Sequence, residues 1–234
     1  MPEITSTPGT PETPAEKKAR KYAEQDQAMV NDISAALTMM ETARDDADIQ
    51  ALLSPKGYAV ADLDDALENL QAPAQAAYNA RQTALGVAKR STENLTKMDA
   101  EERKDFADYR ETARAVFTNK TDWTSLGLNG VAPKDLQKFL TAAQASYAAG
   151  KTAAYTAGLT KRGYSPAAIE AQLAGIKSVS DLSKTQAIAV GAAQKATDTR
   201  DKAAKALKAW VSEFRKIAKR ALRQNPDLLA KLEL

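Results

Sequence analysis

Apolar residues recur every three or four positions along most of the chain from Glu16 onward, which is the spacing of amphipathic helices. The pattern predicts a first long helix over 16–53. The longest regular stretch, 74–117, predicts a helix of roughly 65 Å if it is unbroken. Asp99 begins an Asp-Ala-Glu-Glu run that offers an N-cap for a break there. Because the long helix predicted over 180–223 has no matching stop signal, we expect a continuous or merely kinked helix.

The same sequence pattern occurs twice. The run 53–63 returns as 159–169, and each copy contains a Gly-Tyr pair. Further on, 83–92 returns as 188–197, with one residue fewer in between in the second copy. Each copy therefore predicts the order long helix, Gly-Tyr turn, short helix, long helix. The first short helix is expected at about 60–71, and its counterpart begins with a Ser-Pro N-terminal signal.

This duplication predicts how the apolar stripes are covered. A single helical hairpin leaves half of the apolar stripe of each helix exposed to water, whereas two hairpins packed face to face bury these stripes in a four-helix core. We therefore expect an all-α fold: an elongated antiparallel helical bundle built from two tandem pseudo-twofold-related helical-hairpin repeats, with four long helices plus short helices. Repeat 1 is assigned to 16–128 and repeat 2 to 133–234, forming one domain with a shared core. Residues 1–15, rich in Pro and Thr without apolar periodicity, are expected to be a disordered tail.

Several residues of the repeats are assigned to turns or to packing. The Gly-Tyr pairs are expected to end helices, with each tyrosine over its turn; a paired ligand platform is the alternative. Because glycine inside a helix costs about 1 kcal/mol relative to alanine, its recurrence in both copies suggests close helix contact, with a hinge as the alternative. The two aromatic residues near the end of the last helix are expected in the core. These residues are Gly57, Tyr58, Gly163, Tyr164, Gly86, Gly191, Trp210 and Phe214.

Composition excludes several kinds of chemistry. The 234 residues include no Cys and no His, which removes thiolate nucleophiles, disulfides, the commonest general base and the commonest metal ligands. We expect no enzymatic activity, no cofactor and no metal. Two acidic runs resemble fragments of calcium loops but lack the glycine and final glutamate of such a loop, so a solvated helix face is favoured. The runs contain Asp45, Asp46, Asp48, Asp62, Asp64 and Asp65.

The chain has no stretch of eighteen apolar residues and no basic-then-apolar N-terminus. We therefore expect a cytoplasmic protein without a transmembrane segment.

Charge is strongly segregated although the net charge is only +3. Residues 26–71 hold ten acidic side chains against two basic ones, and residues 200–223 hold nine basic side chains against two acidic ones. The favoured interpretation is that the acidic arm neutralises the basic arm within the fold. The alternatives are binding of nucleic acid or an anionic membrane surface, and binding of an acidic protein. The candidate basic surface consists of Lys205, Lys208, Arg215, Lys216, Lys219, Arg220 and Arg223.

The functional expectation is a non-enzymatic structural or interaction protein. It would serve as a helical-bundle scaffold or a subunit of a larger assembly, with a protein partner or self-association. The alternative is nucleic-acid or anionic-surface binding through the basic C-terminal helix 200–223. Nucleic acid is not favoured because Trp210 and Phe214 are expected in the core rather than stacked on bases. Membrane insertion ranks last because no strongly apolar hairpin tip is present.

Overall fold

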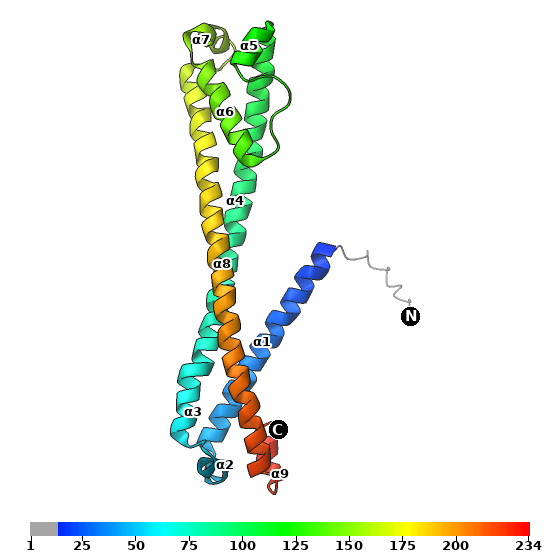
Figure 1. Ribbon diagram of the computed structural model, residues 1–234, viewed down its shortest axis with the longest axis vertical. Helices are drawn as coiled ribbons and strands as arrows, with labels where there is room; N and C mark the ends of the chain where they lie inside the picture. Colours follow the sequence, from blue (N-terminus) through cyan, green and yellow to red (C-terminus); the bar gives the residue numbers. More distant parts are fainter. Residues whose placement is uncertain (1–13) are drawn as a thin grey trace, which may run out of the picture. The chain divides into compact units, whose positions relative to one another are not determined.

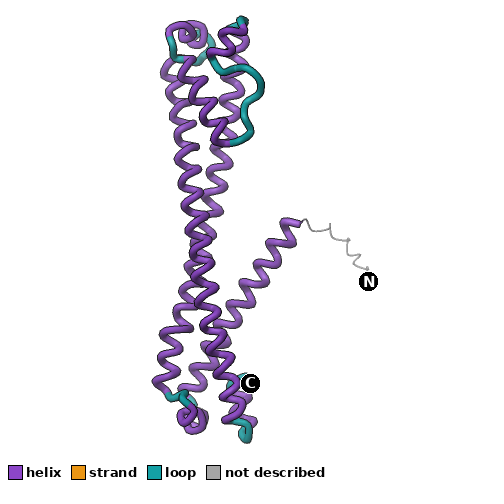
Figure 2. The backbone as a smooth tube through the Cα atoms, viewed as in Figure 1, coloured by secondary structure: helices purple, strands orange, loops and turns teal. Residues whose placement is uncertain are grey.

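The computed structural model describes residues 14–234, which are helical apart from short turns and loops (Figures 1 and 2). No strand occurs in this range, so the all-α class is confirmed. The predicted tail lies outside the described residues except at its end, where Pro14 begins the first helix. In chain order the elements are α1 Pro14–Asp45, α2 Ala47–Leu53, the 3-10 turn Ser54–Lys56, α3 Val60–Ala66, the π-helical turn Leu67–Gln71, α4 Ala72–Val116, α5 Lys120–Ser125, α6 Leu136–Gly150, α7 Ala153–Thr160, α8 Pro166–Ala221 and α9 Pro226–Lys231.

The chain divides into two compact units. Unit 1 comprises Met1–Arg81 and Ala196–Leu234, and unit 2 comprises Gln82–Lys195. Both divisions fall inside the long helices α4 and α8. The assignment of repeats to 16–128 and 133–234 with a shared core stays a prediction. No helix of the described part is long and apolar enough to cross a membrane.

The two longest helices, α4 and α8, are both continuous. α4 runs through Asp99 without a break, as predicted, and the carboxylate of Asp99 pairs with Arg103 one turn later, at 2.9 Å. The expectation of a separate short helix after Ser165 is wrong, because α8 is one helix of 56 residues. At the expected junction Val179 is fully buried, and Ser178 donates a hydrogen bond to the carbonyl of Ala174 within the helix.

The first copy joins its short and long helices through a π turn. At its end the N–H of Ala72 donates to the carbonyl of Leu67, five residues earlier. Pro73 explains this irregularity, because proline has no N–H and its ring clashes with the carbonyl four residues before it in a regular helix. A π turn contains one more residue than an α turn. The extra residue of the first copy therefore falls between Leu70 and Thr83, where the offset between matching positions drops from 106 to 105.

The expectation of a single helix reaching Leu53 is wrong, because the chain breaks at Asp46. The side chain of Asp46 accepts hydrogen bonds from the N–H groups of Asp48 and Ile49, at 3.0 and 3.1 Å, and so caps α2. The second acidic run also caps a helix: Asp62 accepts from the N–H of Ala59 at 2.9 Å. Helix capping therefore accounts for part of the acidic pattern.

Unit 1 has its core among α1, α2, α3, α9 and the last turns of α8. Tyr58, directly after the Gly57 turn, packs edge-on against Trp210 and Phe214, with ring centroids 5.7 and 5.1 Å away. The fully buried or nearly buried side chains are Ile33, Ala36, Met39, Met40, Ala43, Ile49, Leu53, Leu63, Ala66, Ala74, Leu207, Ala218, Leu222 and Leu232.

Unit 2 has an aromatic core between α4, α6 and α8. Phe106, Tyr109, Phe139 and Tyr147 are buried in mutual contact, and Leu126 and Leu128 close the core after α5. A second, smaller contact between α4 and α8 is made by Ala88, Ala189 and Ala193. Alanine at these positions lets the two helix axes approach closely, as their small side chains predict.

The two Gly-Tyr turns have the same local geometry. Gly57 and Gly163 have φ of 83° and 94°, a conformation that favours glycine. The N–H of Tyr58 donates to Leu53, and that of Tyr164 donates to the matching Leu159, at 3.3 and 3.1 Å. Each tyrosine then packs edge-on against an aromatic ring at the end of a long helix: Tyr58 against Phe214, and Tyr164 against Tyr109 at 5.3 Å.

The segments that follow α4 and α8 also end in similar turns. The N–H of Leu128 donates to Trp123 at 2.7 Å, and the N–H of Leu234 donates to Leu229 at 3.1 Å. The residue before each leucine is left-handed: Gly127 has φ 65° and Glu233 has φ 53°. Both ends therefore form the same helix-terminating turn, with glycine in one and a strained glutamate in the other.

The close helix contact expected at Gly86 and Gly191 is not found. A Cβ atom placed at either position would meet nothing within 4 Å. The tight glycines are Gly150, Gly158 and Gly175, where an added Cβ would overlap side chains of unit 2. Glycine is therefore needed at positions that the repeat pattern did not mark.

Replacing a glycine in a left-handed turn and replacing a glycine in an open helical position should have opposite effects on the free energy of unfolding. Gly127→Ala should lower the free energy of unfolding by about 1 kcal/mol, because its φ is left-handed. Gly86→Ala should raise it by about 1 kcal/mol, because the position is helical with open space for a methyl group. Urea unfolding followed by circular dichroism measures both. A loss of stability in Gly86→Ala would contradict the open environment.

One carboxylate is buried in unit 2. Glu102 is 9 % exposed, its Oε2 atom has no hydrogen-bond partner among the described residues, and it lies against Gly175 of α8. Burial, together with the nearby charges of Asp105 and Glu101, raises the pKa of the Glu102 carboxyl above its ordinary value of 4.5. The protonated form is therefore favoured in the folded state.

The stability of the protein should consequently fall as pH rises through the raised pKa of Glu102. Below pH 4.5 the carboxyl is protonated whether the chain is folded or unfolded, so Glu102→Gln should match the parent chain there. Above the raised pKa the parent chain carries a buried charge. Glu102→Gln should then be more stable, on the order of 1 to 3 kcal/mol.

Urea unfolding at a series of pH values measures this difference. Glu111→Gln, an exposed carboxylate on the same helix whose charge is not among those that raise the pKa of Glu102, serves as the control. A constant difference between Glu102→Gln and the parent chain at every pH would show that the carboxyl does not titrate in this range.

Candidate functional site

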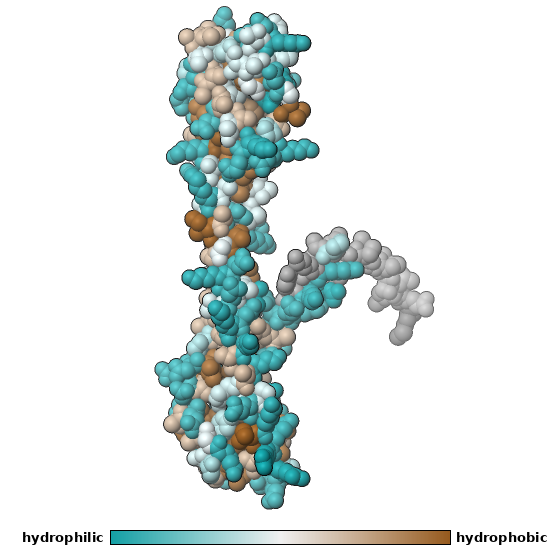
Figure 3. Space-filling model, in the orientation of Figure 1, coloured by the Kyte–Doolittle hydropathy of each residue, from teal (hydrophilic) through white to brown (hydrophobic). Residues whose placement is uncertain are grey.

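The basic residues of α8 form the most distinctive surface of unit 1. All seven candidate cations are exposed. Lys205, Lys208, Arg215 and Lys219 recur at intervals of three, four or seven residues, which places them along one side of the helix. Hydrophilic side chains dominate the face of unit 1 seen in Figure 3, with smaller hydrophobic areas between them.

Five of these cations line a groove between α8 and α1. The groove has a volume of about 810 Å³ and lies within unit 1. Its apolar lining consists of Ala28, Met29, Ile33, Ala204, Leu207 and Val211. Its polar lining consists of Gln25, Asp32, Lys205, Lys208, Ser212, Arg215, Lys216 and Lys219. The groove therefore combines a hydrophobic surface with five positive charges and one negative charge.

Arg220 and Arg223 are exposed but do not line the groove. The structure thus brings together five of the seven predicted cations. The groove itself was not predicted, because the contribution of α1 has no signal in the sequence apart from its helical periodicity.

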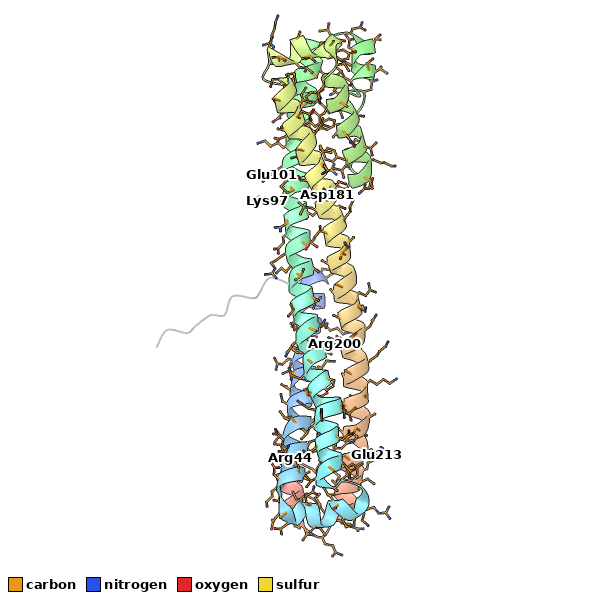
Figure 4. All side chains as sticks on the ribbon, turned by 90° about the vertical axis from the view of Figure 1, so that its left-hand side faces the viewer. Arg44, Lys97, Glu101, Asp181, Arg200 and Glu213 are labelled. Atoms are coloured by element: carbon orange, nitrogen blue, oxygen red, sulfur yellow. The ribbon has the colours of Figure 1, made fainter. Side chains whose placement is uncertain are left out.

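Other charged side chains of the acidic residues 26–71 and the basic residues 200–223 form ion pairs within the fold. Asp26 of α1 pairs with Arg81 of α4 at 2.7 Å and with Arg200 of α8 at 3.0 Å. Lys231 of α9 pairs with Asp46 at 2.6 Å, which lowers the pKa of that carboxyl. Figure 4 labels Arg200 on α8, together with Arg44, which pairs with Asp45 and Asp64.

The seven candidate cations are not neutralised in this way. Within residues 14–234, none of them forms an ion pair or a side-chain hydrogen bond. A helix C-terminus attracts positive charge, which accounts for Lys219 and Arg220 in the last turn of α8. It does not account for Lys205 and Lys208, because the helix dipole acts only over its last turn. Like charges on one helix side repel mildly, so their clustering costs stability unless a ligand is bound.

A smaller hollow of about 370 Å³ lies on another side of α8. Its lining includes Trp210 and Tyr58 with the carboxylates of Asp62, Asp65 and Glu213. Burial, with a smaller contribution from Glu213, raises the pKa of the Tyr58 hydroxyl. Asp62 already caps α3, and nothing in this hollow points to a bound ligand.

The structure places the remaining predicted residues in the framework rather than in a site. Trp210 and Phe214 stack on each other in the core of unit 1, with ring centroids 5.2 Å apart. Tyr58 and Tyr164 belong to different units and each packs over its own turn. Among the described residues, no group of three or more acidic side chains is arranged to hold a metal ion.

No protein-family model, no curated protein and no solved structure matches this chain.

Proposed function

We propose that this chain is a non-enzymatic interaction protein, a helical scaffold that binds an acidic partner protein through the groove between α1 and α8. One observation carries the proposal: an apolar groove is lined by five exposed cations that form no ion pair within residues 14–234, against a single carboxylate. Uncompensated charges on one surface attract an oppositely charged partner and speed its association.

The apolar part of the groove favours a protein over a nucleic acid. Met29, Leu207 and Val211 offer hydrophobic contacts, which a phosphate backbone does not use. Single-stranded nucleic acids are usually held by aromatic side chains on which bases stack, and no aromatic residue lines the groove. A hydrophobic centre with a polar rim is the usual arrangement of a protein interface.

The scaffold in this proposal consists of two tandem pseudo-twofold-related repeats. The shared geometry of the Gly-Tyr turns and of the turns at Gly127 and Glu233 supports this architecture. The π turn supports it as well, because it accommodates the residue by which the first copy is longer. A duplicated framework in which one copy carries the cation-lined groove is suited to presenting a binding surface.

Site-specific photocrosslinking in the cells that produce the protein tests this proposal. A photoreactive p-benzoylphenylalanine replaces Ser212 inside the groove or, as the matched control, the exposed Ala192 of the same helix. We expect a discrete protein adduct from position 212 alone, because only that position faces the partner. Charge reversal by Lys208→Glu and Arg215→Glu should abolish the adduct.

Three outcomes would contradict the proposal. They are the same adducts from both positions, no adduct from position 212, and an adduct that survives charge reversal. An adduct that disappears after nuclease treatment would instead assign the groove to nucleic acid.

A further inference from the structure

Three arginines of α4 hold one non-helical segment of unit 2 by its main chain. Arg110 donates to the carbonyls of Leu128 and Gly130, at 2.9 and 2.8 Å, and Arg114 donates to the same two carbonyls. Arg103 donates to the carbonyls of Pro133 and Lys134, at 2.8 and 3.1 Å. The segment Leu128–Lys134 is therefore held against α4 by its main-chain carbonyls, in addition to the burial of the Leu128 side chain.

The three arginines have counterparts in unit 1. The offset of 105 that matches Tyr109 to Phe214 also matches buried Ala113 to buried Ala218. The same offset places Arg103, Arg110 and Arg114 opposite Lys208, Arg215 and Lys219. All three counterparts line the groove between α1 and α8.

The opposite wall of the groove also has its counterpart. Buried positions of α1 match buried positions of α6 at an offset of 107: Ile33, Ala36, Met40 and Ala43 correspond to Leu140, Ala143, Tyr147 and Gly150. In unit 2 the segment Leu128–Lys134 precedes α6, and its carbonyls accept hydrogen bonds from the arginines of α4. In unit 1, no main-chain carbonyl among residues 14–234 accepts a hydrogen bond from Lys208, Arg215 or Lys219. At the same offset, residues 128–134 correspond to residues 21–27, which continue helix α1 instead of lying over the groove cations. These cations are therefore left without a main-chain partner within residues 14–234.

Two further cations make the groove of unit 1 different from the site in unit 2. Lys205 and Lys216 stand where the other copy has Ala100 and Glu111, so the groove gains positive charge at both positions. Leu207 and Val211 stand where the other copy has Glu102 and Phe106. The groove is therefore suited to acidic side chains at its edge and to an apolar side chain at its floor.

We propose that the groove between α1 and α8 binds an extended, acidic peptide segment of a partner protein. Lys208, Arg215 and Lys219 hold the main-chain carbonyls of this segment, and Lys205 and Lys216 pair with its carboxylates. An extended segment is required because the carbonyls of a helix are already satisfied within that helix. This inference rests on the proposed function, since it specifies the partner of the same groove.

Selection from a phage-displayed library of random twelve-residue peptides on the full-length protein tests the inference. Enriched peptides should be rich in Asp and Glu, should tolerate Pro or Gly inside the motif, and should lack helical periodicity. Their affinity, measured by fluorescence anisotropy, should fall by about tenfold or more in Lys208→Ala/Arg215→Ala/Lys219→Ala. The matched control Lys202→Ala/Arg220→Ala/Arg223→Ala removes the same charge outside the groove and should change affinity by less than about twofold.

A second pair of substitutions separates main-chain binding from simple charge attraction. Lys208→Arg/Lys219→Arg keeps the charge but introduces the planar donors that hold the segment in unit 2. Affinity for the selected peptides should rise by about threefold. An unchanged affinity would leave charge attraction as the whole of the binding and would overturn the role of the carbonyls.

Several results would overturn the inference as a whole. One is that no peptide is enriched on the parent protein relative to the triple groove variant. Another is that the enriched peptides have the pattern of amphipathic helices. A third is that the groove and control variants lose peptide affinity equally. Binding of a labelled oligonucleotide, of anionic vesicles or of a second copy that is lost in the triple variant, without any enriched peptide, would assign the groove to that occupant. If position 212 still crosslinks a partner protein while no peptide is enriched, the partner docks through a folded surface and only this inference fails.

Discussion

Edge-to-face packing of aromatic rings joins distant parts of the chain inside each unit. In unit 1, Tyr58 meets Phe214 at 5.1 Å, although the two residues are far apart in sequence. In unit 2, Tyr164 meets Tyr109 at 5.3 Å. Each contact fixes a glycine turn against the last part of a long helix, and buried leucine and alanine side chains surround it. Aromatic pairs of this kind add to the hydrophobic effect of burying the rings. Because the turn and the helix end are held together, the neighbouring helices have defined positions in each unit.

The charged residues follow the same division between framework and surface. Asp26 lies between Arg81 and Arg200, where partial burial of all three side chains favours pairing over exposure to water. Farther along α8, the cations that line the groove form no ion pair with any carboxylate of residues 14–234. The segregation of charge in the sequence therefore has two outcomes in the fold. Some of it holds helices together, and the rest remains on the wall of the groove.

Periodicity and small local motifs were sufficient for much of this fold. The all-helical class and the unbroken α4 follow from the spacing of apolar residues, because an amphipathic helix must cover its apolar stripe. The sequence pattern did not predict the helix boundaries that depend on local hydrogen bonding. Asp46 ended α1 because its side chain could cap the next helix. At the expected junction near Ser178 and Val179, α8 continues with Val179 buried in the core of unit 2.

The candidate site was only half predictable. The cations of α8 stood out because they cluster in sequence, and their spacing placed them on one side of a helix. The groove depends in addition on how α1 packs against α3 while leaving an open space beside α8, and no residue pattern in α1 specifies that space. The role of Arg103, Arg110 and Arg114 was equally hidden, because their partners are main-chain carbonyls, which have no side-chain signature.

The π turn at Leu67–Gln71 has a consequence for how such a chain can change length. Each residue of an α-helix turns the next by about 100°, so inserting one residue rotates every later side chain away from its neighbours. A π turn absorbs the extra residue locally, and the positions after Pro73 keep the orientation of their counterparts in α8. Single-residue length variation is therefore tolerable at this turn, whereas the same change in the middle of α4 would rotate Phe106 and Tyr109 out of their packing.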